Sequence, residues 1–239
     1  MALETPPNLY SPDFIKHLFD EMAHTYGTVN LISSLGFTCT WRRACINQIP
    51  GSGTRVLDLM TGGGECLGDI KRKYGSDTQV ELVDWSEVMC ARARKLIAQK
   101  KFSNCRVICG NALALPTADA TYDAVYSTFG LKTLTMEEVG LLAREIKRVL
   151  KPGGYFCLME ISVPQPWWLR PGFKIYVKYV VPFLGRLFLG NPDNYRLLWE
   201  YTKAFGNCDQ AARIFRENGL HTRQSDLFFT SATQIYGQK

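Results

Sequence analysis

Histidine is scarce in this chain: only His17, His24 and His221 occur among its 239 residues. The eight cysteines form no C-x-x-C pair and no spacing typical of a structural zinc site. The first residues, MALETPPNLYSPDF, have neither the basic segment nor the apolar core of a secretory signal. These absences argue against a metal site and a disulfide framework, and they predict reduced thiols in a cytoplasmic protein.

Charge of one sign does not dominate the chain either. Lysine and arginine number 28 against 22 acidic residues, and the resulting net charge of +6 is scattered rather than clustered. A nucleic-acid-binding protein normally shows a basic patch or stripe. The composition, 46% hydrophobic and 21% charged, is that of an ordinary globular protein. We therefore expect a globular protein without a nucleic-acid partner.

Short apolar runs alternate with amphipathic helical patterns through the middle of the chain. This alternation is typical of an α/β fold with a parallel sheet covered by helices on both faces. Strands are predicted at residues 54–60, 79–84, 104–109, 122–128, 154–161, 222–229 and 232–238. Helices are predicted between them at residues 65–74, 86–100, 136–150 and 207–218. We expect a sheet of seven strands, of which the last is antiparallel.

Helical segments flank this core, with amphipathic helices predicted at residues 12–24, 29–35 and 41–48. The predicted parts are a helical lid over the ligands (1–50), a core (51–163), an aromatic-rich helical cap (164–206) and a C-terminal helix with strands (207–239). The stretch 164–190 carries four basic residues and several prolines, which make it too interrupted to span a membrane. It could cap a pocket or lie on a membrane surface.

The sequence VLDLMTGGGE, residues 56–65, places three contiguous glycines between a buried strand and a helix. Such glycines let the main chain approach a nucleotide-like ligand closely. Asp84 ends the next strand and can accept hydrogen bonds from both hydroxyls of a ribose. The loop lacks the G-x-G-x-x-G pattern of dinucleotide sites and the lysine of a P-loop, and it carries Asp58 and Glu65 without a base. An acidic loop suits a cationic adenosine cofactor, S-adenosylmethionine.

Further motifs extend over nearly the whole chain. A Y-x-x-x-N-x-x-x-S-x-G spacing from Tyr26 to Gly36 is followed by Trp41, FGL lies at 129–131, and REIKRVLKPGG lies at 144–154. In these motifs the chain resembles class I S-adenosylmethionine-dependent methyltransferases, and among them the C-methyltransferases of ubiquinone and menaquinone biosynthesis. The resemblance implies a Rossmann-like fold with a mostly parallel seven-stranded sheet, N-terminal helices and an inserted helical cap. It also implies S-adenosylmethionine as the cofactor.

The resemblance assigns cofactor contacts to particular residues. The glycine loop would face the methionine part, Asp84 would hold the ribose, and Asn111 with Ala112 would meet the adenine edge. Met89 would cover the adenine face, and Asp58 would order the loop or meet the ammonium group of the cofactor. The complete predicted set is Asp58, Gly62, Gly63, Gly64, Asp84, Trp85, Met89, Asn111, Ala112, Ser127 and Thr128.

Two positions depart from the family pattern. Met60 stands at the end of the first strand, where the family often has a small residue, and this predicts a tighter strand end. Lys132 and Thr133 follow FGL, where the quinone enzymes commonly carry Arg-Asn. An ammonium group is a point charge, whereas a guanidinium offers a planar fork to an oxyanion. The acceptor could therefore be quinone-like, another aromatic compound or a specialised metabolite.

A few side chains are candidates for catalysis of methyl transfer. His24 is the first candidate for a base that takes a hydroxyl proton from the acceptor. Tyr26 could orient the cofactor or the acceptor, Lys132 could stabilise a developing oxyanion, and Glu160 could act as base or hydrogen-bond acceptor. The arginines at 42–43 could contact the acceptor or a lipid headgroup, or remain solvated or ion-paired.

We predict an enzyme that transfers the methyl group of S-adenosylmethionine to a carbon of a hydrophobic small molecule. One alternative is N- or O-methylation of a small molecule or a phospholipid headgroup. Another is a protein of methyltransferase fold with a binding or cyclase function. We expect a monomer or homodimer in the cytoplasm, without a metal, that could contact a membrane peripherally.

Overall fold

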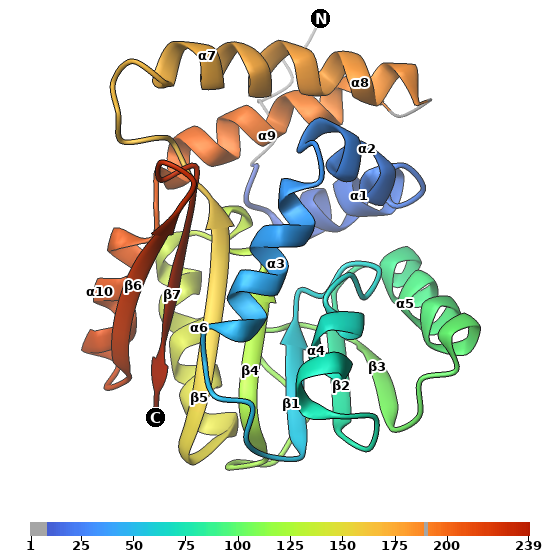
Figure 1. The fold of residues 1–239 in the computed structure, drawn as a ribbon, viewed down its shortest axis with the longest axis vertical. Coiled ribbons are helices and arrows are strands. Elements are labelled where there is room, and N and C mark those ends of the chain that lie inside the picture. Colours follow the sequence, from blue (N-terminus) through green and yellow to red (C-terminus); the bar gives the residue numbers. More distant parts are fainter. Residues whose placement is uncertain (1–8, 189–190) are drawn as a thin grey trace, which may run out of the picture.

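One seven-stranded sheet, in the order β3-β2-β1-β4-β5-β7-β6, forms the centre of the computed structural model, which describes residues 9–188 and 191–239 (Figure 1). The strands are β1 (Arg55–Leu59), β2 (Gln79–Asp84), β3 (Cys105–Cys109), β4 (Tyr122–Thr128), β5 (Leu150–Ile161), β6 (His221–Leu227) and β7 (Ala232–Gln238). Neighbouring strands from β3 to β5 are parallel, and β7 is antiparallel to both β5 and β6. The predicted sheet with its one antiparallel strand is confirmed.

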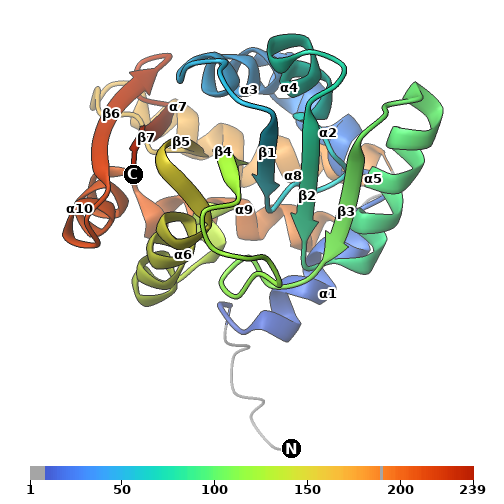
Figure 2. The same cartoon turned by 90° about the horizontal axis from the view of Figure 1, so that it is seen from below.

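Helices cover both faces of the sheet, as predicted (Figure 2). One face carries α3 (Phe37–Asn47), α4 (Leu67–Tyr74) and α5 (Glu87–Lys100), and the other carries α6 (Met136–Val149) and α10 (Asp209–Glu217). Ile46 and Ile70 are fully buried in the apolar core of the first layer, and Ile146 and Phe215 in that of the second. The sheet is thus buried on both faces, and its ligand sites must lie at the strand ends.

Local sequence fixes where two of the core helices begin. The Ser86 hydroxyl precedes α5 and accepts a hydrogen bond from the Met89 amide at 3.1 Å. Thr135 precedes α6 and forms a reciprocal capping box with Glu138. These caps satisfy amide groups that the first helical turn leaves without partners. Both helices therefore begin at a defined residue beside a strand end.

A third helical layer lies over the carboxyl ends of the parallel strands (Figure 1). It consists of α1 (Pro12–Met22), α2 (Tyr26–Ser33), α7 (Arg170–Ile175), a π-helical turn (Tyr176–Val180), α8 (Val181–Leu187) and α9 (Pro192–Phe205). A small apolar core joins the N-terminal helices to α8 and α9 here, with Met22 and Val29 packed against Val181 and Tyr195. Over the described ranges, no helix combines the length and apolarity needed to cross a bilayer.

The element boundaries differ from the sequence expectations at the turns. The second and third helices begin earlier than expected, at Tyr26 and Phe37. The third begins at Phe37 because Gly36, at a φ of 81°, reverses the chain there and the Ser34 hydroxyl accepts a hydrogen bond from the Thr38 amide at 3.2 Å. The KPGG segment lies inside β5 as a bulge, since Tyr122 pairs with Leu150 while Ala124 pairs with Tyr155. The proline and glycines of this segment were visible in the sequence, but the sequence could not show which residues of β4 pair with β5 on either side of the bulge.

The contact between α8 and α9 generates a stability prediction. A Cβ atom at Gly185 would lie 2.3 Å from Cδ2 of Tyr195, whose ring is 1% exposed and whose hydroxyl hydrogen-bonds Thr25 at 2.8 Å. Gly185→Ala should therefore lower the free energy of unfolding by roughly 1–3 kcal/mol, measured by urea denaturation. Gly172→Ala in α7, where nothing lies within 4 Å of the added Cβ, is the matched control. Equal stability of the two variants would contradict this packing.

Candidate active site

Two adjoining cavities lie beneath the third helical layer. The strand-end cavity, about 140 Å³, covers the carboxyl ends of β1, β2, β3 and β4. The capped cavity, about 350 Å³, lies between α1–α3 on one side and α7–α9 on the other. Four residues line both cavities: Phe19, Tyr26, Phe129 and Thr133. A ligand in one cavity can therefore reach a ligand in the other at this junction.

The strand-end cavity is built around Asp84 and the glycine loop. One oxygen of Asp84 accepts from the Gly62 amide at 2.7 Å, and the other accepts from the Ser86 amide at 3.0 Å. Gly62 has a φ of 60°, and a Cβ there would lie 2.7 Å from a carboxylate oxygen of Glu65. Burial raises the pKa of Asp84 to about 6. The carboxylate is fixed in place, and each oxygen keeps a lone pair for a ligand hydroxyl.

The remaining wall of the strand-end cavity suits a flat heterocycle. Trp85 and Met89 line it from the start of α5, and Asn111 with Ala112 line it from the loop after β3. The Asn111 side-chain oxygen accepts from the Leu113 amide at 2.8 Å, which fixes the orientation of the side-chain amide. Thr128 lines the cavity from the end of β4. These residues combine apolar surface with polar edges, as nucleoside sites do.

Some residues of the predicted cofactor set lie behind the cavity wall. Asp58, Gly63, Gly64 and Ser127 are not among its lining residues. Asp58 is 1% exposed and accepts a hydrogen bond from the Thr61 hydroxyl at 2.6 Å. Burial raises the pKa of Asp58 to about 7. Asp58 thus supports the loop from below, one of the two roles expected for it.

Met60 and Gly130 explain a departure from the family pattern. Met60 has a φ of 52° and lines the strand-end cavity. A Cβ atom at Gly130 would lie 2.6 Å from the Met60 sulfur, so the Met60 side chain occupies space that only glycine leaves open. Gly130 had appeared only within the FGL motif, and Thr61, which also lines the cavity, carried no distinguishing signal in the sequence. Glu65 had been seen only as part of the acidic loop.

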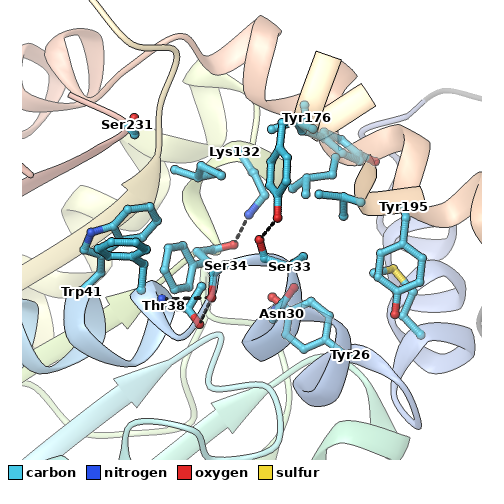
Figure 3. A pocket seen from close by; sticks show the side chains of 18 of the residues that line it. Tyr26, Asn30, Ser33, Ser34, Thr38, Trp41, Lys132, Tyr176, Tyr195 and Ser231 are labelled. Carbon is cyan, nitrogen blue, oxygen red and sulfur yellow. Dashed lines mark hydrogen bonds between the residues drawn. The ribbon is translucent and has the colours of Figure 1, made fainter. Parts of the chain in front are cut away.

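The capped cavity is lined mostly by apolar and aromatic side chains, with several polar groups among them (Figure 3). Its walls include Trp41 and Phe129 near the sheet and Phe173, Val177 and Val181 from the helices above. Its polar lining residues are Asn30, Ser33, Ser34, Thr38, Lys132, Thr133, Asn194 and Ser231. A cavity of this size and character suits an apolar ring with few polar substituents. Asn30 had appeared only as a spacing residue of the Tyr26–Gly36 motif, not as a candidate site residue.

Lys132 and Glu160 form a buried ion pair in the wall of the capped cavity. The Lys132 ammonium lies 3.0 Å from Glu160 Oε1, and the two side chains are 7% and 0% exposed. Glu160 also accepts from the backbone amides of Lys132 at 3.1 Å and of Ile161 at 2.7 Å, while the ammonium donates to the carbonyl of Phe129. With three donors on its carboxylate, Glu160 holds Lys132 in place. Lys132 lines the cavity, and its ammonium group is held in one position there (Figure 3).

Tyr26 and His24 have different positions although they are close in sequence. Tyr26 lies at the junction of the two cavities, and burial raises the pKa of its hydroxyl to about 12, so the group remains a donor near neutral pH. His24 is exposed and lines neither cavity. His17 and His221 are likewise exposed and lie outside both cavities. The structure therefore brings Tyr26, Lys132 and Glu160 together but not His24.

The strand-end cavity fits S-adenosylmethionine. Asp84 offers oxygens to a ribose, and Gly62 leaves space that any side chain would fill. The carboxylate of Glu65 provides negative charge for a cationic ligand.

Comparison with known proteins agrees with this fit. The profile of the ubiE/COQ5 methyltransferase family matches residues 9–234. A demethylmenaquinone methyltransferase of Deinococcus radiodurans is 34% identical over 94% of this chain and 92% of its own length. One from Lactiplantibacillus plantarum is 34% identical over 94% and 95%. The ubiquinone/menaquinone biosynthesis C-methyltransferase UbiE of Escherichia fergusonii is 32% identical over 88% and 84%.

Solved structures share the fold at low sequence identity. A SAM-dependent methyltransferase from Aquifex aeolicus superposes with a TM-score of 0.56 at 19% identity, covering 81% of this chain and 85% of its own. A Haloferax volcanii methyltransferase in complex with its Trm112 activator gives a TM-score of 0.61 at 18% identity, covering 94% and 96%. Because the family profile spans nearly the whole chain, this protein belongs to the ubiE/COQ5 methyltransferase family and is an S-adenosylmethionine-dependent methyltransferase.

Proposed function

We propose that the enzyme methylates a ring carbon of a hydrophobic quinol, with the cofactor in the strand-end cavity and the acceptor in the capped cavity. The observation that carries this proposal is the junction, where four residues line both cavities. The names of the demethylmenaquinone methyltransferases support a quinol acceptor. The apolar lining supports a ring acceptor over a phospholipid headgroup, whose charges such a lining would leave unsatisfied.

The strand-end residues bind and orient the cofactor in this proposal. Bound S-adenosylmethionine supplies an electrophilic methyl group. Asp84 accepts from the ribose hydroxyls, Asn111 and Ala112 meet the adenine edge, and Met89 covers the adenine face. Gly62 of the glycine loop would face the methionine part of the cofactor. Orientation of the two reactants is the main contribution expected of the protein.

Lys132 activates the acceptor in this proposal. A positive charge beside a phenol-like hydroxyl favours its ionised form, which makes the ring carbon more nucleophilic. Glu160 is a positioning residue, because its carboxylate holds the Lys132 ammonium at the cavity wall. Tyr26 donates a hydrogen bond at the junction. Since none of the three histidines lines either cavity, the hydroxyl proton would pass to solvent once Lys132 has stabilised the anion. After methyl transfer, the ring carbon would lose its own hydrogen as a second proton to solvent, which restores the ring.

The outer face of α7–α8 supports a peripheral membrane contact. Ile175, Tyr179, Phe183 and Leu187 recur every four residues and are 57%, 60%, 65% and 63% exposed. Lys174, Lys178 and Arg186 lie beside this stripe, and no acidic residue occurs between positions 160 and 193. An apolar stripe with flanking basic residues fits the interface of an anionic bilayer.

The mouth of the capped cavity adds to this argument. Leu35 and Phe228 line the cavity and are 84% and 53% exposed, so they mark its opening. Phe228 contacts Phe229, which packs edge-on against Trp168. These exposed aromatic rings surround an opening through which a lipid-dissolved quinol could enter. The enzyme would thus take its acceptor directly from the bilayer.

Asp84→Asn should weaken binding of S-adenosylhomocysteine roughly 10- to 100-fold in isothermal titration calorimetry, because the amide replaces a charged acceptor of two hydrogen bonds. Since the pKa of Asp84 lies at about 6, wild-type affinity should fall as the pH is lowered from 7.5 to 5, and the variant should lose this dependence. Asp77→Asn, in the exposed turn before β2, is the matched control. Wild-type affinity in Asp84→Asn would refute the proposed binding mode.

Lys132→Met should lower the turnover of demethylmenaquinol roughly 100-fold while S-adenosylhomocysteine affinity stays within about twofold. The double variant Lys132→Met/Glu160→Gln removes both charges and tests whether an unpaired Glu160 has perturbed the fold. Turnover should stay low in the double variant, with thermal stability restored toward wild type. Recovery of turnover in the double variant would show that Lys132 only neutralises Glu160.

Wild-type protein should cosediment with vesicles that contain phosphatidylglycerol and should dissociate as salt is raised. Lys174→Glu/Lys178→Glu and Tyr179→Ser/Phe183→Ser should each reduce the bound fraction several-fold, because they remove the charged and the apolar contribution separately. Arg213→Glu in α10, a 65% exposed site on another face, should bind like wild type. A loss in Arg213→Glu and in the lysine variant, with none in Tyr179→Ser/Phe183→Ser, would point to net charge rather than to this face.

A further inference from the structure

Among the described residues, Arg42 is a buried cation without an ion-pair partner. It projects from α3, is 7% exposed and lines the strand-end cavity. Its guanidinium lies 5.1 Å from the centroid of the Phe129 ring, and its Nε atom is buried without a hydrogen-bond partner. Within residues 9–188 and 191–239, the side chain forms neither a hydrogen bond nor an ion pair that would satisfy it.

Two other buried cations of the described chain, Lys71 and Lys132, are satisfied. Lys71 donates to three backbone carbonyls at 2.6 to 2.9 Å, and Lys132 is paired with Glu160 at 3.0 Å. A charged group removed from water destabilises the fold unless it is paired and hydrogen-bonded. The aromatic contact with Phe129 compensates only a small part of this cost. Arg42 therefore calls for an anion that enters the cavity from outside.

The position of Arg42 restricts which anion that is. Arg42 lines the strand-end cavity but not the capped cavity, so an oxyanion of the acceptor is not its partner. Glu65 lines the same cavity, but its carboxylate and the Arg42 guanidinium form no ion pair within 4.0 Å. A cation and an anion held apart in one cavity fit a zwitterion. An amino acid carries an ammonium and a carboxylate on one carbon.

We propose that Arg42 and Glu65 together clamp the amino-acid end of the cofactor, with the Arg42 guanidinium on the carboxylate and the Glu65 carboxylate on the ammonium. A guanidinium can bind a carboxylate through two parallel hydrogen bonds, which also fixes its orientation. This inference rests on the proposed placement of S-adenosylmethionine in the strand-end cavity. It names the charged groups that recognise the methionine part, whereas Asp84 recognises the ribose.

The clamp also connects the two cavities. Arg42 faces the cofactor from α3, while Thr38 and Trp41 on the same helix line the capped cavity. A cofactor held by Arg42 therefore fixes the helix that forms one wall of the acceptor site. Hydrogen exchange of the α3 amides should slow when S-adenosylhomocysteine binds, and this slowing should be lost in Arg42→Met.

Three ligands distinguish how much each charge of the amino-acid end contributes to binding. S-adenosylhomocysteine carries both charges, its decarboxylated analogue keeps only the ammonium, and 5′-methylthioadenosine carries neither. By calorimetry, Arg42→Met should lose roughly 10- to 100-fold in affinity for S-adenosylhomocysteine and nothing for the other two ligands. Glu65→Gln should lose affinity for the first two ligands and nothing for 5′-methylthioadenosine. Arg42→Lys should retain part of the affinity.

Arg43→Met is the matched control, because the neighbouring side chain is 58% exposed and pairs with Asp69 on the surface. It should bind all three ligands like wild type. An equal loss for S-adenosylhomocysteine and 5′-methylthioadenosine in Arg42→Met would show that Arg42 only maintains the cavity, and would overturn the clamp. An unchanged affinity in that variant would overturn it as well. If wild type bound none of the ligands, the proposed cofactor site itself would fail.

Discussion

The hydrogen bond from the Gly62 amide to Asp84 joins the ends of the neighbouring strands β1 and β2, and the site depends on it. It exists because parallel strands present their carboxyl ends at one edge of the sheet, where loops from different strands meet. The bond requires a loop backbone that no side chain obstructs, which Gly62 provides. Asp84 is thereby held with lone pairs facing the cavity, and the helix α5 starts immediately after it.

The capped cavity also depends on residues that meet at the carboxyl ends of two neighbouring parallel strands. β4 and β5 end beside each other, and the FGL segment between β4 and α6 places Lys132 against Glu160 at the end of β5. A buried ion pair contributes little net stability, since desolvation offsets most of its attraction. Its contribution here is to fix the position of the Lys132 ammonium. The pair holds one positive charge in a mostly apolar cavity, where it acts on the acceptor with little competition from water.

The replacement of Arg-Asn by Lys132-Thr133 is compatible with this arrangement. The lysine ammonium satisfies Glu160 and the Phe129 carbonyl, and the Thr133 hydroxyl donates to the Gly130 carbonyl at 2.7 Å. Gly130 in turn leaves the space that Met60 occupies. The two departures from the family pattern are therefore neighbours in space, connected through the same short segment. The acceptor end of the site differs from the family pattern here, while the nucleoside end keeps Asp84 and the glycine loop.

The sequence by itself determined the strand–helix alternation, the antiparallel last strand, the glycine loop and Asp84, because these features depend on periodicity and local backbone requirements. Tertiary structure alone decided which side chains meet. His24 was a reasonable base by residue type, but it lies exposed in the turn between α1 and α2, and Asp58 lies beneath the loop rather than in the cavity. Arg42 was one of two adjacent arginines with no signal to separate them. Only the packing of α3 on the sheet buries one guanidinium beside the cofactor cavity and leaves the other on the surface, since residues adjacent on a helix point in different directions.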